Sequence, residues 1–155
     1  MGASRIDLKR TTSDDPGFVS LVRLLDAELA VRDGADHAFY AQYNSIDAIR
    51  HAVLALDGKT PVGCGAIKEY APGTMEVKRM FVLQERRGAG VATQVLAELE
   101  RWAGELGASR CILETGKKQP EAIALYTKNG YTPMPNYGQY AGVTNSVCFE
   151  KVFGA

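Results

Sequence analysis

Apolar positions repeat with a helical period near the start of the chain. From residue 18 to residue 29 they recur every three or four positions, which predicts an amphipathic helix. Asp14, Asp15 and Pro16 precede this run and suit the cap and first turn of a helix, and Gly34 suits its end. A short strand is expected at residues 6–8, and a second piece, helical or irregular, at residues 36–50.

From residue 51 the period shortens to that of strands. Three strands are expected, at residues 51–56, 62–70 and 75–83. The first two are joined across Asp57-Gly58, a strong hairpin signal, and Pro72-Gly73 marks the next turn. Gly63 and Gly65 inside the second strand predict a bulge or the close approach of another backbone.

The second half of the chain alternates between the two periods. Helices are expected at residues 91–106 and 120–128, and strands at residues 111–113 and 147–153. The first of these helices is expected to bury Val91, Val95, Leu96, Leu99 and Trp102. The order of elements predicts a single α/β domain over residues 1–155, built as a mixed α+β sandwich.

Composition gives no global electrostatic bias. The 155 residues are 46% hydrophobic and 23% charged, and 18 basic residues balance 18 acidic ones. A nucleic-acid partner is therefore not expected, and any anion site must be local. No apolar run suits a membrane span or a secretion signal. Cys64, Cys111 and Cys148 are odd in number, far apart and set among apolar or small residues, which favours buried thiols in a cytoplasmic protein over disulfides or a zinc site.

The segment from Arg86 to Ala92 joins an apolar, strand-like run to a helix and carries two glycines. A helix that starts this way leaves backbone N–H groups without partners, and the positive end of the helix dipole lies beside them. Gly88 and Gly90 take positive φ readily and keep side-chain atoms away from the backbone. The segment therefore predicts an anion site suited to phosphate oxygens.

Two other phosphate motifs do not match this segment. A Walker A loop requires Lys and then Ser or Thr after its second glycine, and neither glycine is followed by that pair. A dinucleotide-binding Gly-x-Gly-x-x-Gly fingerprint fails because Thr93 occupies the position of its third glycine.

Three separated segments resemble the GNAT family of N-acetyltransferases. Residues 87–92 match its Arg/Gln-x-x-Gly-x-Gly/Ala signature for acetyl-CoA, and residues 76–82 are similar to its fourth strand. Residues 119–131 are similar to its Asn-x-x-Ala-x-x-Leu-Tyr-x-x-x-Gly-Phe stretch, with Gln119 where many members have Asn. The order of elements fits as well, so the resemblance covers nearly the whole chain.

The resemblance implies a mostly antiparallel, twisted sheet that is splayed between its fourth and fifth strands and flanked by helices. The pantetheine arm of acetyl-CoA would lie along the opened fourth strand, and the pyrophosphate on the N–H groups of the turn. The cofactor-binding residues implied are Met80, Phe81, Val82, Arg87, Gly88, Ala89, Gly90, Val91, Ala92, Gln119 and Tyr126. Arg86, Arg87, Lys117 and Lys118 are candidates for the outer phosphates, with solvated surface charges as the alternative for the lysines.

Direct acetyl transfer to an amine requires a base, a donor that polarises the thioester carbonyl, and an acid for the departing thiolate. Glu76 is the first candidate base and Glu114 the second; a surface or salt-bridged carboxylate is an equally good interpretation of Glu76. A backbone N–H near Met80 or Phe81 would polarise the carbonyl. Tyr126 matches the family tyrosine that faces the CoA sulfur and is the candidate acid, with a packed aromatic as the alternative. No metal and no cysteine nucleophile are required.

The sequence specifies the acceptor least. A small primary amine is the default expectation, with Phe39, Tyr40, Tyr137 and Tyr140 as candidate substrate-binding residues. The alternatives are an acetyltransferase acting on a protein N-terminus or lysine, a non-catalytic acyl-CoA sensor, and a nucleotide-binding α/β domain. A homodimer is a possible assembly.

Overall fold

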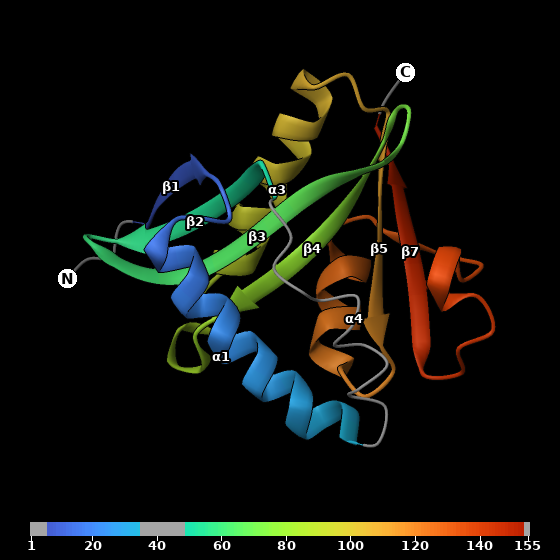
Figure 1. Ribbon diagram of the computed structural model, residues 1–155, viewed down its shortest axis with the longest axis horizontal. Coiled ribbons are helices and arrows are strands. Elements are labelled where there is room, and N and C mark those ends of the chain that lie inside the picture. The colour runs from blue at the N-terminus through green and yellow to red at the C-terminus, as the bar shows by residue number, and fades with distance from the viewer. Residues whose placement is uncertain (1–5, 35–48, 154–155) are drawn as a thin grey trace.

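One mixed sheet organises the computed structural model, which describes residues 6–34 and 49–153 (Figure 1). The elements are β1 (Ile6–Thr11), α1 (Pro16–Asp33), β2 (His51–Asp57), β3 (Thr60–Ala71), β4 (Thr74–Val82), η2 (Gln84–Arg86), α3 (Val91–Glu105), β5 (Arg110–Gly116), α4 (Pro120–Lys128), β6 (Thr132–Met134), η3 (Gly138–Tyr140) and β7 (Ser146–Val152). The strands lie in the order β1-β2-β3-β4-β5-β7-β6, and β4 and β5 form the single parallel pair among the described strands. The predicted mostly antiparallel sheet with flanking helices is confirmed.

Local signals place the ends of the elements close to where the sequence predicts them. Asp15 caps α1, because its side chain accepts a 2.9 Å hydrogen bond from the N–H of Gly17, and Pro16 occupies the first helical position. Gly58 and Gly73 have φ of 64° and 78°, as the two predicted hairpin turns require. None of the described helices combines the length and the apolar character that a membrane-spanning helix needs.

The sequence analysis missed β6, a strand of three residues. Pro133 lies in its middle and pairs with Phe149 of β7. A proline is tolerated there because β6 is the outer strand of the sheet, so one side of its backbone has no strand to bond.

The sheet buries a different apolar cluster on each face, and alternation along β2 shows how. Ala52 and Leu54 pack into a cluster with α1, while Val53 and Ala55 pack into a cluster with α3 and α4. All four side chains are at most 2% exposed. In Figure 1, α1 accordingly lies in front of the sheet and α3 behind it.

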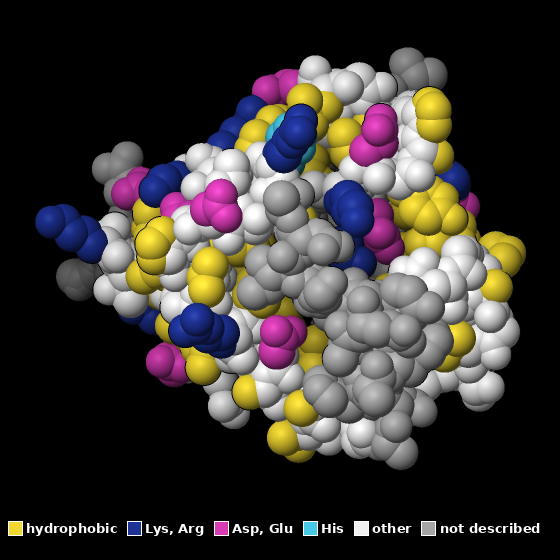
Figure 2. Space-filling model, viewed as in Figure 1, with side chains coloured by type: hydrophobic (Ala, Val, Ile, Leu, Met, Phe, Trp, Pro, Cys, Tyr) yellow, Lys and Arg dark blue, Asp and Glu magenta, His cyan; other side chains and the backbone are white. Residues whose placement is uncertain are grey.

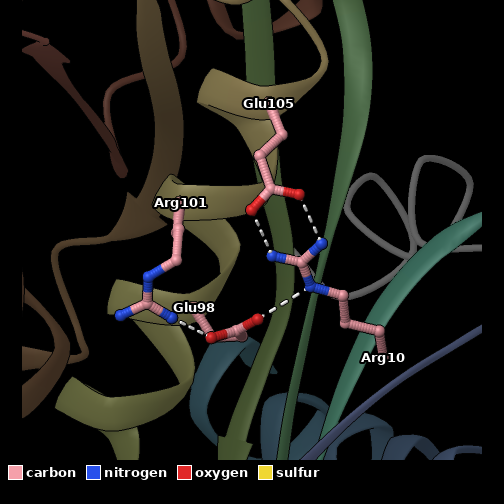
Figure 3. Close-up of polar contacts among 4 residues, drawn as sticks. All are labelled: Arg10, Glu98, Arg101 and Glu105. Atoms are coloured by element: carbon pink, nitrogen blue, oxygen red, sulfur yellow. Dashed lines mark hydrogen bonds and ion pairs between the residues drawn. The ribbon is translucent and has the colours of Figure 1, made fainter.

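A polar cluster fastens β1 to the outer side of α3 (Figure 3). Both guanidinium NH₂ groups of Arg10 donate to Glu105, at 2.7 and 2.8 Å, and its Nε donates to Glu98 at 2.7 Å. Arg101 binds the other oxygen of Glu98. The Arg10 guanidinium also lies 4.8 Å above the ring of Trp102. Trp102 is therefore half-buried under this cluster and not buried in the core as predicted.

Gly65 marks a tight contact between the sheet and α3. A Cβ added to Gly65 would lie 2.5 Å from Met80 Sδ and 2.8 Å from Leu99 Cδ1. The strand register also shifts between Cys64 and Ala66, opposite β4. The extra residue at this shift belongs to β4, whereas the bulge within β3 is at Val62, beside Gly63, where the register with β2 shifts. The close approach at Gly65 is made by side chains rather than by a second backbone.

We expect Gly65→Ala to lower the free energy of unfolding by about 1–3 kcal/mol, because the methyl group overfills this contact. Gly104→Ala is the matched control: it lies near the end of α3, and no atom is within 4 Å of the added Cβ. That change should be neutral or raise stability by up to about 1 kcal/mol. Urea unfolding followed by circular dichroism measures both, and equal stabilities would contradict the packing.

Candidate active site

Backbone N–H groups at the start of α3 have no hydrogen-bond acceptor among the residues that the structure describes. Gly88 and Gly90 have φ of 83° and 84°, a conformation that favours glycine, and Gly90 caps the helix without a side chain. The first intrahelical bond runs from the N–H of Gln94 to the carbonyl of Gly90, at 3.1 Å. Within the described residues, none of the hydrogen bonds uses an N–H from Gly88 to Thr93 as its donor. These groups and the helix dipole together form a positive backbone cradle.

A groove of about 400 Å³ runs beside this turn, between β4, α1 and α4. Ten of the residues predicted to bind the cofactor line it: Met80, Phe81, Val82, Arg87, Gly88, Gly90, Val91, Ala92, Gln119 and Tyr126. Ala89 belongs to the turn but does not line the groove. A Cβ added to Gly88 or Gly90 would meet no atom of the described residues within 4 Å, apart from its own neighbours in the chain, so both glycines face open space in this part of the structure.

The arginines at the mouth of the groove are already paired. Arg87 donates to Glu28 of α1 at 2.8 Å and to the carbonyl of Val82 at 3.0 Å. Arg86 forms an ion pair with Asp57, at 2.6 Å. The positive character of the turn therefore comes from its backbone as much as from side chains. Lys117 and Lys118 line neither this groove nor the chamber described below, whereas Thr93 and Lys128, which the sequence analysis did not single out, do line the groove.

β4 and β5 pair at three positions and then part. The last paired residues are Glu76 and Ile112, so from Val77 onward the edge of β4 that faces β5 has no partner among the described strands. Figure 1 shows the two strands diverging from their common end. The predicted splay between the fourth and fifth strands is confirmed.

A bulge in β4 lies where the strands have parted. Lys78 pairs with Ala66 and Phe81 with Cys64, so Arg79 and Met80 together lie opposite the single residue between. Arg79 has φ of 61° and is the one non-glycine residue with positive φ in the described chain. The sequence offers no signal for this conformation at an arginine, and the analysis did not predict it.

A second, smaller chamber of about 110 Å³ opens from the parted strands. Its polar wall is formed by Glu76, Lys78, Arg79, Glu114, Thr115 and Tyr140. It shares Leu25, Met80, Gln119, Ala122 and Tyr126 with the groove, so the two spaces meet at these residues. An apolar-sided groove thus leads to a charged chamber.

Tyr126 of α4 lies at the junction of the groove and the chamber. It is 6% exposed and packs edge-on against Tyr131, with ring centroids 5.7 Å apart. Burial raises the pKa of its phenol, and the charge of Glu114 raises it further. The hydroxyl therefore keeps its proton at neutral and mildly alkaline pH and is available as a donor.

Glu76 lies in the chamber wall and is 7% exposed, so it is not a surface carboxylate. The Tyr137 hydroxyl donates a 2.6 Å hydrogen bond to it, and Lys78 Nζ lies 3.9 Å from its other oxygen. Burial is the main cause that raises the pKa of Tyr137 and that lowers the pKa of Lys78. Glu76 is thus held by a neutral donor and by a long ion pair.

Glu114 faces the same chamber from β5. Its Oε2 accepts a 2.7 Å hydrogen bond from the Ser146 hydroxyl. Both predicted base candidates therefore lie in one chamber, and both remain candidates.

The predicted acceptor residues have different places. Tyr140 lines the chamber, whereas Tyr137 lines neither space and instead supports Glu76. Phe39 and Tyr40 lie outside the described residues. The analysis missed Leu25 and Glu28, because nothing local to α1 indicates that this helix crosses the parted strands.

The three cysteines are buried in the packed interior, and their thiols stay protonated at neutral pH. Cys64, Cys111 and Cys148 are buried free thiols, as predicted, and burial raises the pKa of Cys64 and of Cys111 to about 12. Within residues 6–34 and 49–153, no three His, Cys, Asp or Glu side chains are grouped so that they could hold a metal ion.

The Acetyltransferase (GNAT) family model matches residues 18–131, a span that includes the turn, the parted strands and Tyr126. The chain belongs to the GNAT family. Among the relatives of this GNAT acetyltransferase, IAA acetyltransferase of Azospirillum brasilense is 34% identical over 149 residues, covering 94% of this chain and 97% of the relative. Aminoalkylphosphonate N-acetyltransferase of Salmonella typhimurium is 30% identical over 135 residues, covering 81% and 84%.

Solved structures share the fold of this GNAT protein. A Klebsiella pneumoniae protein assigned as an acyl-CoA N-acyltransferase has a TM-score of 0.82 at 27% identity and covers 98% of this chain and 100% of its own. A GNAT acetyltransferase of Elizabethkingia anophelis, solved with acetyl-CoA bound, has a TM-score of 0.69 at 16% identity, covering 97% and 100%. The second likeness supports the fold alone.

Proposed function

We propose that this GNAT protein transfers an acetyl group from acetyl-CoA to the primary amine of a small molecule, by direct transfer in a ternary complex. The observation that carries the proposal is the junction at Tyr126, where a groove with a backbone anion cradle meets a charged chamber. A sensor that only binds coenzyme has no need of the second space.

The groove fits the coenzyme. Its volume of about 400 Å³ is in the range typical of ligand sites. The N–H groups from Gly88 to Thr93 suit the diphosphate, since each charge-assisted bond contributes about 1.5–3 kcal/mol. The unpaired edge of β4 offers further N–H and C=O groups to the amides of the pantetheine arm. The coenzyme itself supplies an acetyl group activated as a thioester.

The side chains around the junction suit both proton transfers. Glu76 or Glu114 accepts a proton from the ammonium group, and the neutral amine then bonds to the acetyl carbon. Tyr126 donates its proton to the sulfur as the carbon–sulfur bond breaks, which its raised pKa permits because the phenol stays neutral until then. The second proton, which the nitrogen loses once it is bonded to the acetyl carbon, restores the phenol. A chamber of about 110 Å³ favours a small acceptor over a protein surface. The relative named for aminoalkylphosphonates supports a small amine as well.

We expect the purified protein to release CoA from acetyl-CoA in the presence of some members of a panel of small primary amines. Thiol release measures turnover, and mass spectrometry identifies the N-acetyl product. Binding of acetyl-CoA without turnover on any small amine would favour the sensor, while turnover on peptides alone would favour a protein acceptor. Affinity for ATP or NAD without affinity for acetyl-CoA would favour the nucleotide-binding alternative.

We expect Gly90→Val to weaken acetyl-CoA binding at least about 10-fold, or 1.4 kcal/mol, because its side chain would enter the open space beside the cradle. Calorimetry measures the affinity. Valine also strains a backbone with φ of 84°, so Gly90→Asn, which tolerates positive φ, separates obstruction from strain. Gly104→Ala, at the other end of α3, is the control that should bind normally. Wild-type affinity in both Gly90 variants would refute the cradle.

We expect Tyr126→Phe to lower kcat by about 10²-fold or more with little change in acetyl-CoA affinity, since only the proton donor is lost. The ring and its contact with Tyr131 are retained. Because the pKa of Tyr126 is raised above its ordinary value of about 10, kcat of the wild type should not fall through loss of this proton below pH 9. An unchanged kcat in the variant would remove Tyr126 as the acid.

A further inference from the structure

We propose that Tyr137 is a positioning residue, whose hydroxyl holds the carboxylate of Glu76 so that Glu76, rather than Glu114, takes the proton from the acceptor amine. This inference rests on the acetyl transfer proposed above and assigns the base within it. Tyr137 lines neither the groove nor the chamber, so its effect on the reaction passes through Glu76.

The side chain of Glu76, and not only its backbone, faces the chamber. Lys78 lies two residues further along β4 and so projects from the same face of the sheet. Its pairing partner Ala66 packs into the apolar cluster that contains Leu25 of α1, and Leu25 also lines the chamber. The face that carries Glu76 and Lys78 is therefore the face on which the chamber lies.

One hydrogen bond orients this carboxylate. The Tyr137 hydroxyl donates to Oε2 of Glu76 at 2.6 Å, a length typical of a charge-assisted O–H···O⁻ bond. Lys78 Nζ lies 3.9 Å from the other oxygen, Oε1, which is too far for a hydrogen bond. Oε1 thus keeps its capacity to accept a hydrogen bond, and then a proton, from an ammonium group.

Tyr137 is itself held firmly, as a positioning residue must be. It is 9% exposed, and its ring packs edge-on against Tyr70 and Tyr140, with ring centroids 5.1 and 5.7 Å away. Its carbonyl accepts a 2.9 Å hydrogen bond from the N–H of Tyr140. The neighbouring Asn136 side chain donates to two carbonyls further along the chain, at 3.0 and 3.1 Å, which closes the loop between β6 and β7.

Glu114 has a different effect in the chamber. After burial, its charge is the cause that raises the pKa of Tyr126, so Glu114 helps the acid to keep its proton as long as it stays ionised itself. Burial also raises the pKa of Tyr137, and the charge of Glu76 and their hydrogen bond raise it further, so this phenol remains a donor at neutral and mildly alkaline pH. We therefore assign proton uptake to Glu76 and the support of Tyr126 to Glu114.

The bond from Tyr137 favours the ionised form of the Glu76 carboxylate. Without it the carboxylate takes up a proton more readily, so the acid limb of the pH profile of kcat should move to higher pH. Of the groups around Glu76, the carboxylates are those that ordinarily change charge on the acid side of neutrality. The described charged and titratable groups near it, besides Tyr137, are Lys68, Lys78, Arg79, Glu114, Tyr140 and Cys148.

Tyr137→Phe should lower kcat at least about 10-fold with the small amine that is turned over fastest, because the carboxylate loses its orientation while the ring packing is kept. KM for the amine should change less, and acetyl-CoA affinity should not change, since Tyr137 does not line the groove. Tyr70→Phe is the matched control, because the same hydroxyl is removed from a ring that packs against Tyr137 outside both spaces. It should keep the wild-type kcat.

Paired variants show whether Tyr137 acts through Glu76. In a Glu76→Gln background, Tyr137→Phe should change kcat less than about 2-fold, whereas in a Glu114→Gln background it should keep its full effect. The acid limb of kcat should move up by about half a pH unit or more in Tyr137→Phe and should be absent in Glu76→Gln. Glu76→Asp, which withdraws the carboxylate by one methylene and leaves Tyr137 in place, should lower kcat at least about 10-fold; it is the second variant if Tyr137→Phe does not fold.

Each outcome bears on a different statement. An unchanged kcat with an unshifted acid limb in Tyr137→Phe would overturn the positioning role, as would an undiminished kcat in Glu76→Asp. Equal effects of Tyr137→Phe with and without Glu76→Gln would reveal a purely structural role and overturn it too. Loss of the acid limb in Glu114→Gln instead would make Glu114 the base and leave acetyl transfer standing. Failure of the wild-type protein to acetylate any amine would overturn both proposals.

Discussion

The parting of β4 from β5 is the constraint on which the site depends. These two strands are parallel, so the chain between them must cross over, and here it crosses through α3. Because parallel strands end at the same edge of a sheet, α3 begins beside the end of β4 and α4 begins beside the end of β5. The two helix N-termini therefore border the opening, as ligand sites in sheets with parallel strands commonly require. The opening and its anion cradle have one topological cause.

The bulge gives this opening its chemical character. β4 keeps its pairing with β3 along its length, so the extra residue at Arg79 bends the strand without detaching it. Past Glu76 the edge of β4 that faces the opening has no partner among the described strands, and charged side chains line the chamber beside it. Tyr126, buried and neutral, separates the two. An extended ligand can therefore lie along the backbone while its reactive end faces titratable groups.

α1 completes the site from the opposite face of the sheet. Glu28 binds Arg87 of the turn, and Arg32 one turn further along α1 binds Glu121 in the first turn of α4. These ion pairs connect α1 to both helix N-termini across the parted strands. They also pair charged side chains near the cradle, so its positive character comes from the backbone N–H groups as much as from side chains. Figure 2 is consistent with this: acidic and basic side chains are interspersed on the face it shows, without an extended patch of one sign.

Elements that depend on neighbours in the chain were predictable from the sequence. The cap at Asp15, the hairpin turns and the start of α3 at Gly90 follow from propensities that act within a few residues, and the family resemblance supplied the splayed sheet. The bond from Tyr137 to Glu76 spans 61 positions, and the meeting of Glu76 with Glu114 depends on strand order. β6 and the half-exposed Trp102 likewise depend on distant partners, Phe149 and Arg10. The sequence by itself thus determined the helices, the longer strands and the glycine turn at the start of α3, because their causes are local. Only the tertiary structure decided which charges share the chamber, because side-chain contacts between distant strands leave no periodic trace in the chain.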